Sequence, residues 1–322
     1  MLKRSDLADP LSDILALVKP RSVACGAVDA GDVHLTFPRD NGIKCHAVIE
    51  GKAWLLVEGI ASPYRIGAGD FILLPHGRAY ALASDLNLAS VDYQTVLAGG
   101  SPGHLLTYNG GGCATLISVA FTVDRGHAEM LLKVLPPVVH LQADVGQLAL
   151  NQSLTQSLSQ SLNQSLHQMM REFRKPQPGS RLIVEHLTTM VLAQALRAYL
   201  AHIGPGNVGW LFALADEWIG TAIGAMHADP SYRWSVQDLA HRAGLGRTSF
   251  SNRFKYTVGC PPMEYLSQLR MMLARERLST SNDTVNQIAE AVGYESESSF
   301  SSAFKRRVGC APGHYAKTTR VA

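Results

Sequence analysis

Residues 284–315 read TVNQIAEAVGYESESSFSSAFKRRVGCAPGHY, and residues 235–265 carry a second version of the same pattern, SVQDLAHRAGLGRTSFSNRFKYTVGCPPMEY. The two stretches align at an offset of 49 residues in their first half and 50 in their second half, so one turn is a residue longer in the second copy. A chain that matches itself in this way indicates one supersecondary unit used twice.

Each copy has the residues that begin a helix and then end it in a tight turn. A Ser or Thr suits the N-cap, an Asp or Gln three residues later resembles a capping box, and a glycine follows the last turn. These residues are Ser235, Asp238 and Gly244 in the first copy, and Thr284, Gln287 and Gly293 in the second. The pattern predicts a helix, a turn and a second helix in each copy.

The second helix of each copy is predicted to have an apolar and a polar face. Phenylalanines spaced by four residues, Phe250 with Phe254 and Phe300 with Phe304, anchor it to the first helix. A helix anchored by aromatics with a free polar face has the geometry that enters a DNA major groove. The polar face consists of Arg247, Thr248, Ser251 and Asn252 in the first copy, and of Glu297, Ser298, Ser301 and Ser302 in the second.

The segment between the copies, Pro262–Leu278, is predicted to be one continuous helix that holds both units, so that two recognition helices lie about 34 Å apart in successive major grooves. From Arg233 to Arg320 the chain has 13 Lys and Arg against 7 Asp and Glu, within a net charge of +3 for all 322 residues. A basic C-terminal part on an acidic remainder indicates a phosphate-binding module. The alternative is a generic pair of helical hairpins, which the matching of two copies disfavours.

Residues 234–318 resemble the DNA-binding domain of the AraC/XylS family, most specifically from Ile288 to Ser296 and on to Tyr315. The resemblance implies sequence-specific binding to double-stranded promoter DNA, activation, and RNA polymerase as a partner. Carried over by position, it also implies that bases are read by Arg247, Thr248, Ser251 and Asn252 in the first copy, and by Glu297, Ser298 and Ser302 in the second. Many relatives carry Arg where this chain has Ser302, so the second unit is expected to contribute mainly backbone contacts. The residues expected to make them are Lys305, Arg306 and Arg307.

Residues from about 20 to 125 are predicted to form strands. The runs Cys45–Ile49 and Ala53–Val57 are separated by Glu50-Gly51-Lys52, which favours a hairpin, and Phe71–Leu74 lies between two turn signals. Several short strands at this spacing are typical of a β-sandwich or barrel. The predicted fold class is therefore α+β, with an N-terminal barrel, a helical connector and an all-α C-terminal domain.

Two motifs in the strand region, from Gly42 to Gly59 and from Gly69 to Gly77, resemble those of the cupin barrel, and the resemblance covers about residues 7–200. Cupin enzymes bind a metal through three His and one Glu, whereas the corresponding residues here are Lys44, His46, Glu50 and Tyr80. Because two of four ligands are too few, no metal and no cofactor are expected. The preferred interpretation is a pocket for an unknown small effector. Its candidate lining residues are His46, Glu50, Trp54 and Tyr80.

Two alternative functions stay open for the N-terminal part. One is a cupin-type metal-dependent enzyme with an accessory DNA-binding domain. The other is a redox-sensing regulator that uses Cys25, Cys45 and Cys113, against the simpler interpretation that these thiols are buried packing groups. Five cysteines without CxxC spacing argue against a disulfide framework or a zinc site. The favoured prediction is a regulator that is not an enzyme.

The helical connector is expected at residues 126–228, after the sensor barrel at 7–125 and before the DNA-binding domain at 229–320. It contains a repeat of the type QSL over 151–168, with leucines every four residues. This repeat is either a dimerisation helix or a tolerated expansion that lengthens a helix. Helices are also predicted from about Arg181 to His202 and from about Leu211 to Ala228.

The remaining expectations concern location. No stretch approaches the roughly 18 apolar residues that a membrane span needs. Residues 1–10 are polar and acidic, without an apolar signal segment. The expected location is the cytoplasm, without a membrane partner.

Overall fold

The computed structural model describes residues 9–98, 103–143, 152–202 and 208–320. By its internal contacts the chain divides into two compact units, each assembled from segments that are separate in sequence. We call them the β unit, Pro20–Val123 with Leu135–Ile203, and the helical unit, Met1–Lys19 with Asp124–Val134 and Gly204–Ala322. The boundaries expected from the sequence are continuous stretches, whereas both units are discontinuous.

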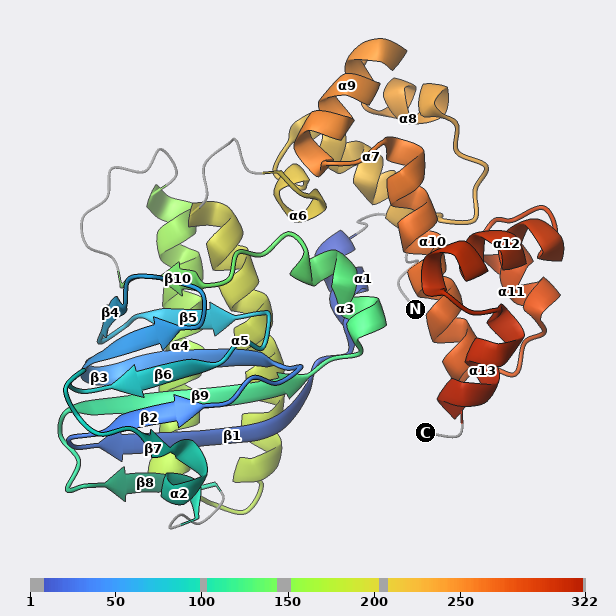
Figure 1. Cartoon of the computed structure of the whole chain (residues 1–322). Helices are drawn as coiled ribbons and strands as arrows, with labels where there is room; N and C mark the ends of the chain where they lie inside the picture. Colours follow the sequence, from blue (N-terminus) through green and yellow to red (C-terminus); the bar gives the residue numbers. More distant parts are fainter. Residues whose placement is uncertain (1–8, 99–102, 144–151, 203–207, 321–322) are drawn as a thin grey trace. The chain divides into compact units, whose positions relative to one another are not determined.

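The described part of the β unit has ten strands in one curled sheet (Figure 1). The main path of neighbouring strands is β7-β2-β6-β3-β9-β1-β8, while β5 pairs with β3 and β10, and β4 pairs with β3. The strands are β1 (Arg21–Ala30), β2 (His34–Phe37), β3 (Ile43–Val57), β4 (Tyr64–Gly67), β5 (Phe71–Leu74), β6 (Tyr80–Ala83), β7 (Val91–Asp92), β8 (Leu105–Tyr108), β9 (Ala114–Thr122) and β10 (Val139–Leu141). A short helix, α2 (Tyr93–Leu97), follows β7.

Strand β3 runs unbroken through Glu50-Gly51-Lys52, so the hairpin predicted there is wrong. Its first half pairs with β9 and β5, and its second half pairs with β6 and β4. Gly51 has φ +80°, and a Cβ on it would lie 2.0 Å from the carbonyl oxygen of Cys113. The glycine therefore lets a single strand bend between two parts of the sheet. A glycine between polar residues is also typical of a hairpin turn, so the local sequence does not distinguish a bend from a turn.

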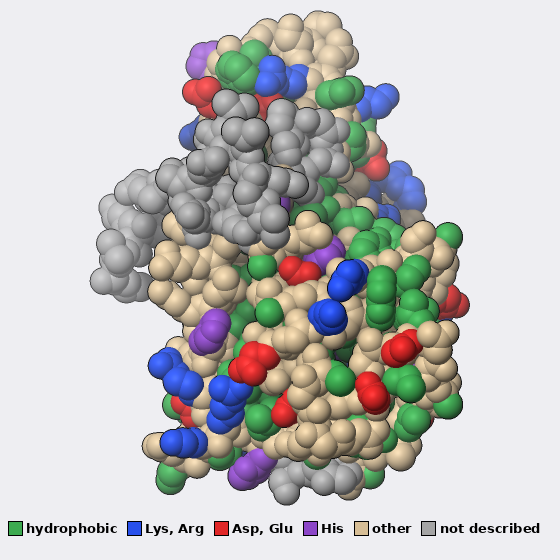
Figure 2. Space-filling model, turned by 90° about the vertical axis from the view of Figure 1, so that its left-hand side faces the viewer, with side chains coloured by type: hydrophobic (Ala, Val, Ile, Leu, Met, Phe, Trp, Pro, Cys, Tyr) green, Lys and Arg blue, Asp and Glu red, His purple; other side chains and the backbone are tan. Residues whose placement is uncertain are grey.

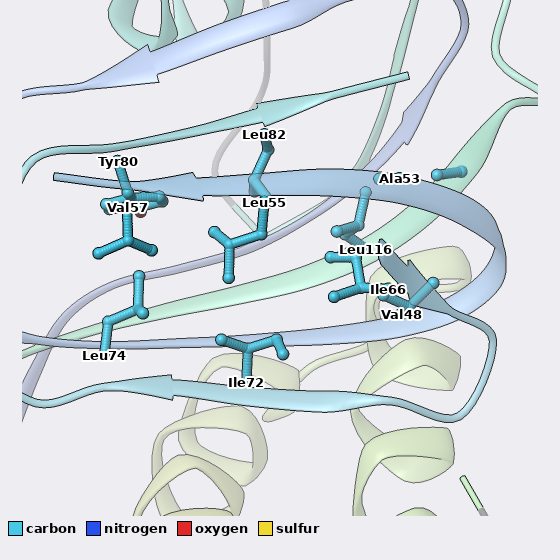
Figure 3. Close-up of a cluster of buried hydrophobic side chains, with 11 residues drawn as sticks. Val48, Ala53, Leu55, Val57, Ile66, Ile72, Leu74, Tyr80, Leu82 and Leu116 are labelled. Carbon is cyan, nitrogen blue, oxygen red and sulfur yellow. The ribbon is translucent and has the colours of Figure 1, made fainter. Parts of the chain in front are cut away.

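The interior of the curled sheet is filled by apolar side chains (Figure 3). Leu55, Ile66 and Ile72 have no exposed surface or almost none. In Figure 3, Val57 and Leu74 point toward one another from opposite strands. This burial is the main stabilising contribution to the β unit, at about 25 cal/mol for each Å² of apolar surface.

Two long helices, α4 (Gln152–Arg174) and α5 (Ser180–His202), pack on each other and on the sheet (Figure 1). The leucine stripe of the QSL repeat faces this packing, because Leu162 and Leu166 are buried. The side chain of Leu154 and the whole of residue 151 lie outside the described residues. The repeat thus extends a helix that covers its own unit.

The described part of the helical unit contains the two predicted copies, α8–α9 and α11–α12, and six further helices. Its helices in the described residues are α1 (Pro10–Val18), α3 (Arg125–Leu132), α6 (Trp210–Ala213), α7 (Glu217–Ala228), α8 (Val236–Arg242), α9 (Arg247–Val258), α10 (Pro262–Thr280), α11 (Val285–Ala291), α12 (Glu297–Val308) and α13 (Pro312–Arg320). The single helix predicted from Leu211 to Ala228 is wrong. Asp216 accepts hydrogen bonds from the backbone of Trp218 and Ile219, and this cap starts α7 as a separate helix.

Helices α1 and α3 precede or interrupt the strand region in sequence, yet they belong to the helical unit. Ile14 of α1 is fully buried, and Lys19 forms an ion pair with Glu276 of α10. Arg275 of α10 donates a hydrogen bond of 2.6 Å to the carbonyl oxygen of Gly126, near the start of α3. The segments that form α1 and α3 come from the N-terminal half of the chain, but they are structural parts of the helical unit.

No helix among the described residues is both long and apolar enough to span a membrane. Acidic and basic side chains are interspersed on the face of the molecule seen in Figure 2. The described side chains visible on that face therefore form no large patch of one charge sign.

Candidate nucleic-acid interface and effector site

Both predicted helix-turn-helix copies are present with their predicted caps. The capping boxes Ser235–Asp238 and Thr284–Gln287 are complete, with the side chain and the backbone bonded in both directions. A hydrogen-bonded cap of this kind contributes about 1 kcal/mol to helix stability. Gly244 and Gly293 have φ angles of +67° and +83°, so both turns use the left-handed conformation that favours glycine.

The predicted aromatic anchors are confirmed in both copies. The side chains of Phe250, Phe254, Phe300 and Phe304 are all completely buried. The ring centroids are 5.6 Å apart within each pair, a distance at which tilted aromatic pairs attract. The second helix of each copy, α9 or α12, is thus fixed along one side.

The opposite side of α9 carries the predicted reading residues. Arg247, Thr248 and Asn252 are exposed and Ser251 is half-buried. None of the four forms a side-chain hydrogen bond or ion pair with a described residue, so their polar groups are free for another molecule. Tyr256 was not among the predicted residues; it is 75% exposed and lies one turn beyond Asn252 on the same face. The four-residue spacing from Asn252 is the signal that would have found it.

The exposed side of α12 is different. Glu297, Ser298 and Ser302 are exposed at its start and middle, while Lys305, Arg306 and Arg307 are exposed in its last turn. Arg307 lies 4.0 Å from Glu264 of α10, whereas Lys305 and Arg306 have no ion-pair partner among the described residues. The middle of this face offers small hydroxyl groups, and its end offers cations suited to phosphate.

An unpredicted contact holds α9 to α7. Arg253 of α9 donates from Nε and Nη2 to Asp216, at 3.0 and 2.8 Å, and its guanidinium lies 4.1 Å from the ring centroid of Trp218. Asp216 is the residue that also caps α7. The first recognition helix is therefore tied to the helix that precedes its unit.

Of the four effector candidates in the β unit, two face the interior. His46 is buried and hydrogen-bonds to the hydroxyls of Tyr80 (3.0 Å) and Ser118 (2.9 Å). Burial, with a smaller contribution from Lys44, lowers the pKa of His46 to about 3, so the ring is neutral. Both ring nitrogens are thus satisfied within the protein. Tyr80 also stacks on Phe37, with ring centroids 4.4 Å apart.

Glu50 and Trp54 lie apart from His46 and Tyr80. The register of β3 against β9 shifts between Val48 and Glu50, which turns Glu50 to the face covered by α4, where it pairs with Arg174 at 2.7 Å. Trp54 is half-buried next to the interior residue Leu55, and Arg65 lies over its ring at 5.9 Å. The four candidates therefore do not form one site.

The β unit has a cavity of about 1110 Å³ between the outer face of its sheet and α4. Glu50 is the predicted effector residue that borders it. Phe71, Leu162 and Met170 contribute apolar surface, and Arg171 and Arg174 contribute charge. Arg171 makes no ion pair with another described residue.

The three cysteine candidates are held as thiols. Burial raises the pKa of Cys25 to about 12 and raises that of Cys45 further above its usual value. Burial and a hydrogen bond of 3.6 Å to Asp32 raise the pKa of Cys113. Because the thiolate is the reactive form, these environments do not activate them. Among the described residues, no three His, Cys, Asp or Glu side chains cluster as metal ligands would.

Two capped helix-turn-helix units with exposed second helices, carried on one chain with a curled β unit, define a DNA-binding transcription regulator. The chain belongs to the AraC-like transcription regulators. A family model described as cupin matches residues 9–201, and one described as a helix-turn-helix domain matches residues 239–318. The matches confirm both resemblances drawn from the sequence.

Two Streptomyces relatives agree with this assignment along most of the chain. An AraC-like transcription regulator of Streptomyces lividans is 37% identical over 90% of this chain and 92% of its own length. One of Streptomyces antibioticus is 36% identical over the same shares. The DNA-binding domain of AdpA, solved in complex with a target DNA, is 27% identical over 33% of this chain and 96% of that domain, with a TM-score of 0.32.

Proposed function

We propose that this regulator recognises its promoter mainly through α9, with Arg247, Thr248, Ser251 and Asn252 at base edges, while α12 makes chiefly phosphate contacts through its last turn. The observation that carries the proposal is the exposed and unpaired polar face of α9 behind two fully buried phenylalanines. Asn and Arg are the side chains suited to two-point contacts with adenine and guanine. Glu297, Ser298 and Ser302 are assigned weaker contacts at the second unit.

Replacement of Asn252 by alanine tests the base-reading assignment. Asn252→Ala is expected to weaken specific binding by roughly 1–3 kcal/mol and to relax the base preference at one position. Fluorescence anisotropy at several salt concentrations measures this on a duplex selected from a random pool by the wild-type chain. Asn286→Ala, at an exposed Asn of α11, is the matched control. Unchanged affinity and selectivity in Asn252→Ala would overturn the assignment.

We further propose that the β unit binds a small effector in the cavity beside α4. Apolar surface beside Arg171, which has no ion-pair partner among the described residues, favours a ligand with an apolar body and an acidic group. A thermal shift screen of aliphatic and aromatic carboxylates tests this. Arg171→Ala is expected to abolish the stabilisation by a bound carboxylate, and Arg181→Ala, at an exposed arginine of α5, is expected to keep it. Equal stabilisation of both variants would exclude the cavity.

DNA binding by this chain is proposed to control transcription. We infer a cytoplasmic activator that contacts RNA polymerase at the promoter, is not an enzyme, and acts as a homodimer or as a monomer. Because the matched relatives are named transcription regulators, regulation is favoured over the metal-dependent enzyme. The protonated thiols leave redox sensing as the weaker alternative. In vitro transcription from the selected promoter with purified RNA polymerase tests activation, and a fall in transcript would indicate repression.

A further inference from the structure

The segment that leads into the first helix-turn-helix unit touches the turn of the second one. We call this segment, Pro230–Tyr232, the lead-in segment; it is part of the connection between α7 and α8. Gly293, in the turn after α11, has φ +83°, and a Cβ on it would lie 2.5 Å from the carbonyl oxygen of Ser231. The backbones of two segments about 60 residues apart are thus packed directly against each other, without room for a side chain.

Arg270 bonds the same two places to the helix that joins the units. It lies near the middle of α10 and donates from Nε to the carbonyl of Pro230 and from Nη2 to the carbonyl of Tyr232, both at 2.8 Å. Its guanidinium lies 5.8 Å from the ring centroid of Tyr294, the residue after Gly293. A half-buried guanidinium with two carbonyl acceptors and an aromatic neighbour has one defined position.

An exposed ion pair adds a further contact across the same junction. Nη1 of Arg233 lies 2.9 Å from Oε1 of Glu295, and both side chains are more than 70% exposed. A surface pair of this kind contributes little by itself. The junction therefore depends on Arg270 and on the close backbone packing at Gly293.

The first helix-turn-helix copy has no counterpart to this arrangement among the described residues. Gly244 stands at the repeat position that corresponds to Gly293 and also has a positive φ, +67°, but no described atom lies within 4 Å of the place where its Cβ would be. The close packing at Gly293 is therefore not required by the helix-turn-helix turn itself. It results from the contact between the second helix-turn-helix copy and the lead-in segment.

We propose that Arg270, the lead-in segment and Gly293 form a latch that fixes the second recognition helix relative to the first. Helix α10 by itself is a single connection between the two helix-turn-helix copies, and a single connection leaves the second copy able to bend and rotate relative to the first. The latch adds a second connection beside α10, and two connections fix the relative orientation of the copies. Arg270 is thus a positioning residue for a two-part DNA site, which rests on the proposed function that both α9 and α12 contact DNA.

The spacing of the two half-sites tests the latch. The probes are the duplex selected by the wild-type chain and versions with one base pair inserted or removed between the half-sites, plus one with the second half-site scrambled. For the wild type, a one-pair change is expected to weaken binding on the order of tenfold, because rigid docking then moves the weaker base contacts assigned to Glu297, Ser298 and Ser302 off the second half-site. For Arg270→Ala and Arg270→Lys, the loss is expected to shrink to about twofold to threefold, with weaker binding to the original duplex. Lysine fails because one ammonium group does not reproduce the guanidinium fork.

Two controls separate positioning from folding. Arg277→Gln replaces an exposed arginine of the same helix and is expected to keep the wild-type spacing profile. Gly293→Ala and Gly244→Ala place the same methyl group at the same backbone conformation, but only the first pushes on the lead-in segment. Gly293→Ala is expected to broaden spacing tolerance, and Gly244→Ala is not. Circular dichroism melting identifies any variant that fails to fold.

The outcomes are distinct. A spacing profile that stays sharp in folded Arg270→Ala and Gly293→Ala would overturn the latch while leaving two-site recognition intact. If scrambling the second half-site does not weaken binding by the wild type, recognition by α12 fails, and the latch fails with it. A broad profile in those two variants, with Arg277→Gln and Gly244→Ala unchanged, supports the proposal.

Discussion

At the scale of single residues, His46 and Glu50 are of the types that bind a metal in cupins, but their surroundings give them other roles. His46 occupies a metal-ligand position of the cupin pattern, yet its two nitrogens are taken by Tyr80 and Ser118 inside an apolar interior. Glu50, four residues later on the same strand, faces the opposite side because the register shifts between them. Spacing along a strand predicts a shared face only while its pairing stays regular.

The buried ring of His46 makes the stability of the β unit depend on pH. Its pKa is about 3 in the folded chain and near 6.5 when unfolded, so between these values the unfolded state binds the extra proton. Stability is therefore lost as pH falls through 6.5 toward 3. From pH 7 to pH 5 we expect a loss of about 2 kcal/mol, measured by urea unfolding followed by the difference in fluorescence between the chain and its Trp54→Phe variant.

The His46 variants show whether this residue is the cause. His46→Gln is expected to flatten the pH dependence, even though the variant is less stable overall. His186→Gln changes an exposed histidine of α5 and is expected to keep the full dependence. The same slope in both variants would contradict the assignment.

At the scale of elements, the two recognition helices share a scaffold and differ in the surface they present. Both are held by buried phenylalanines and begin after a glycine turn. The unpaired polar groups of α9 lie in its first two turns, whereas the unpaired cations of α12 lie in its last turn. The difference predicts that α9 makes most of the base contacts and that α12 makes mostly phosphate contacts.

Arg306 provides a test at this scale. Arg306→Ala is expected to weaken binding about equally on specific and random duplexes and to lower the slope of log K against log salt by about 1. Titrations of both duplexes between low and moderate salt measure this. Arg242→Ala, at an exposed arginine at the end of α8, is the comparison. A loss confined to the specific duplex would instead make Arg306 a base-reading residue.

At the scale of the whole molecule, the units do not follow the order of the chain. Helices α1 and α3 flank strands of the β unit in sequence, yet they pack with α7 and α10. Their connections to the sheet are short: β1 starts at Arg21 after α1 ends at Val18, and α3 starts three residues after β9 ends. Residues Arg21 and Thr122 at these strand ends are paired partners. Both connections therefore start close to paired residues of the same two strands.

A core substitution in α1 tests its membership of the helical unit. Ile14→Ala removes a fully buried side chain and is expected to destabilise the helical unit by about 2–5 kcal/mol. Three of the four tryptophans, Trp210, Trp218 and Trp234, lie in this unit, so unfolding followed by fluorescence in a Trp54→Phe background reports on it. Ile183→Ala, at a partly exposed residue of α5, is expected to leave this transition unchanged. An unchanged transition for Ile14→Ala in this background would contradict the membership of α1 in the helical unit.

The sequence by itself determined the elements whose signals are local. Caps, glycine turns and phenylalanine pairs lie within about twenty residues of each other and occur twice, so they predicted the helix-turn-helix units and, through them, the class of protein. Tertiary structure decided what depends on distant partners: the unbroken β3 across Gly51, the separation of Glu50 from His46, the place of α1, and the packing of Arg270 and Gly293 on the lead-in segment. Each of these is a contact between segments far apart in the chain. Local patterns do not encode such contacts, because burial and pairing fix them only when the whole unit folds.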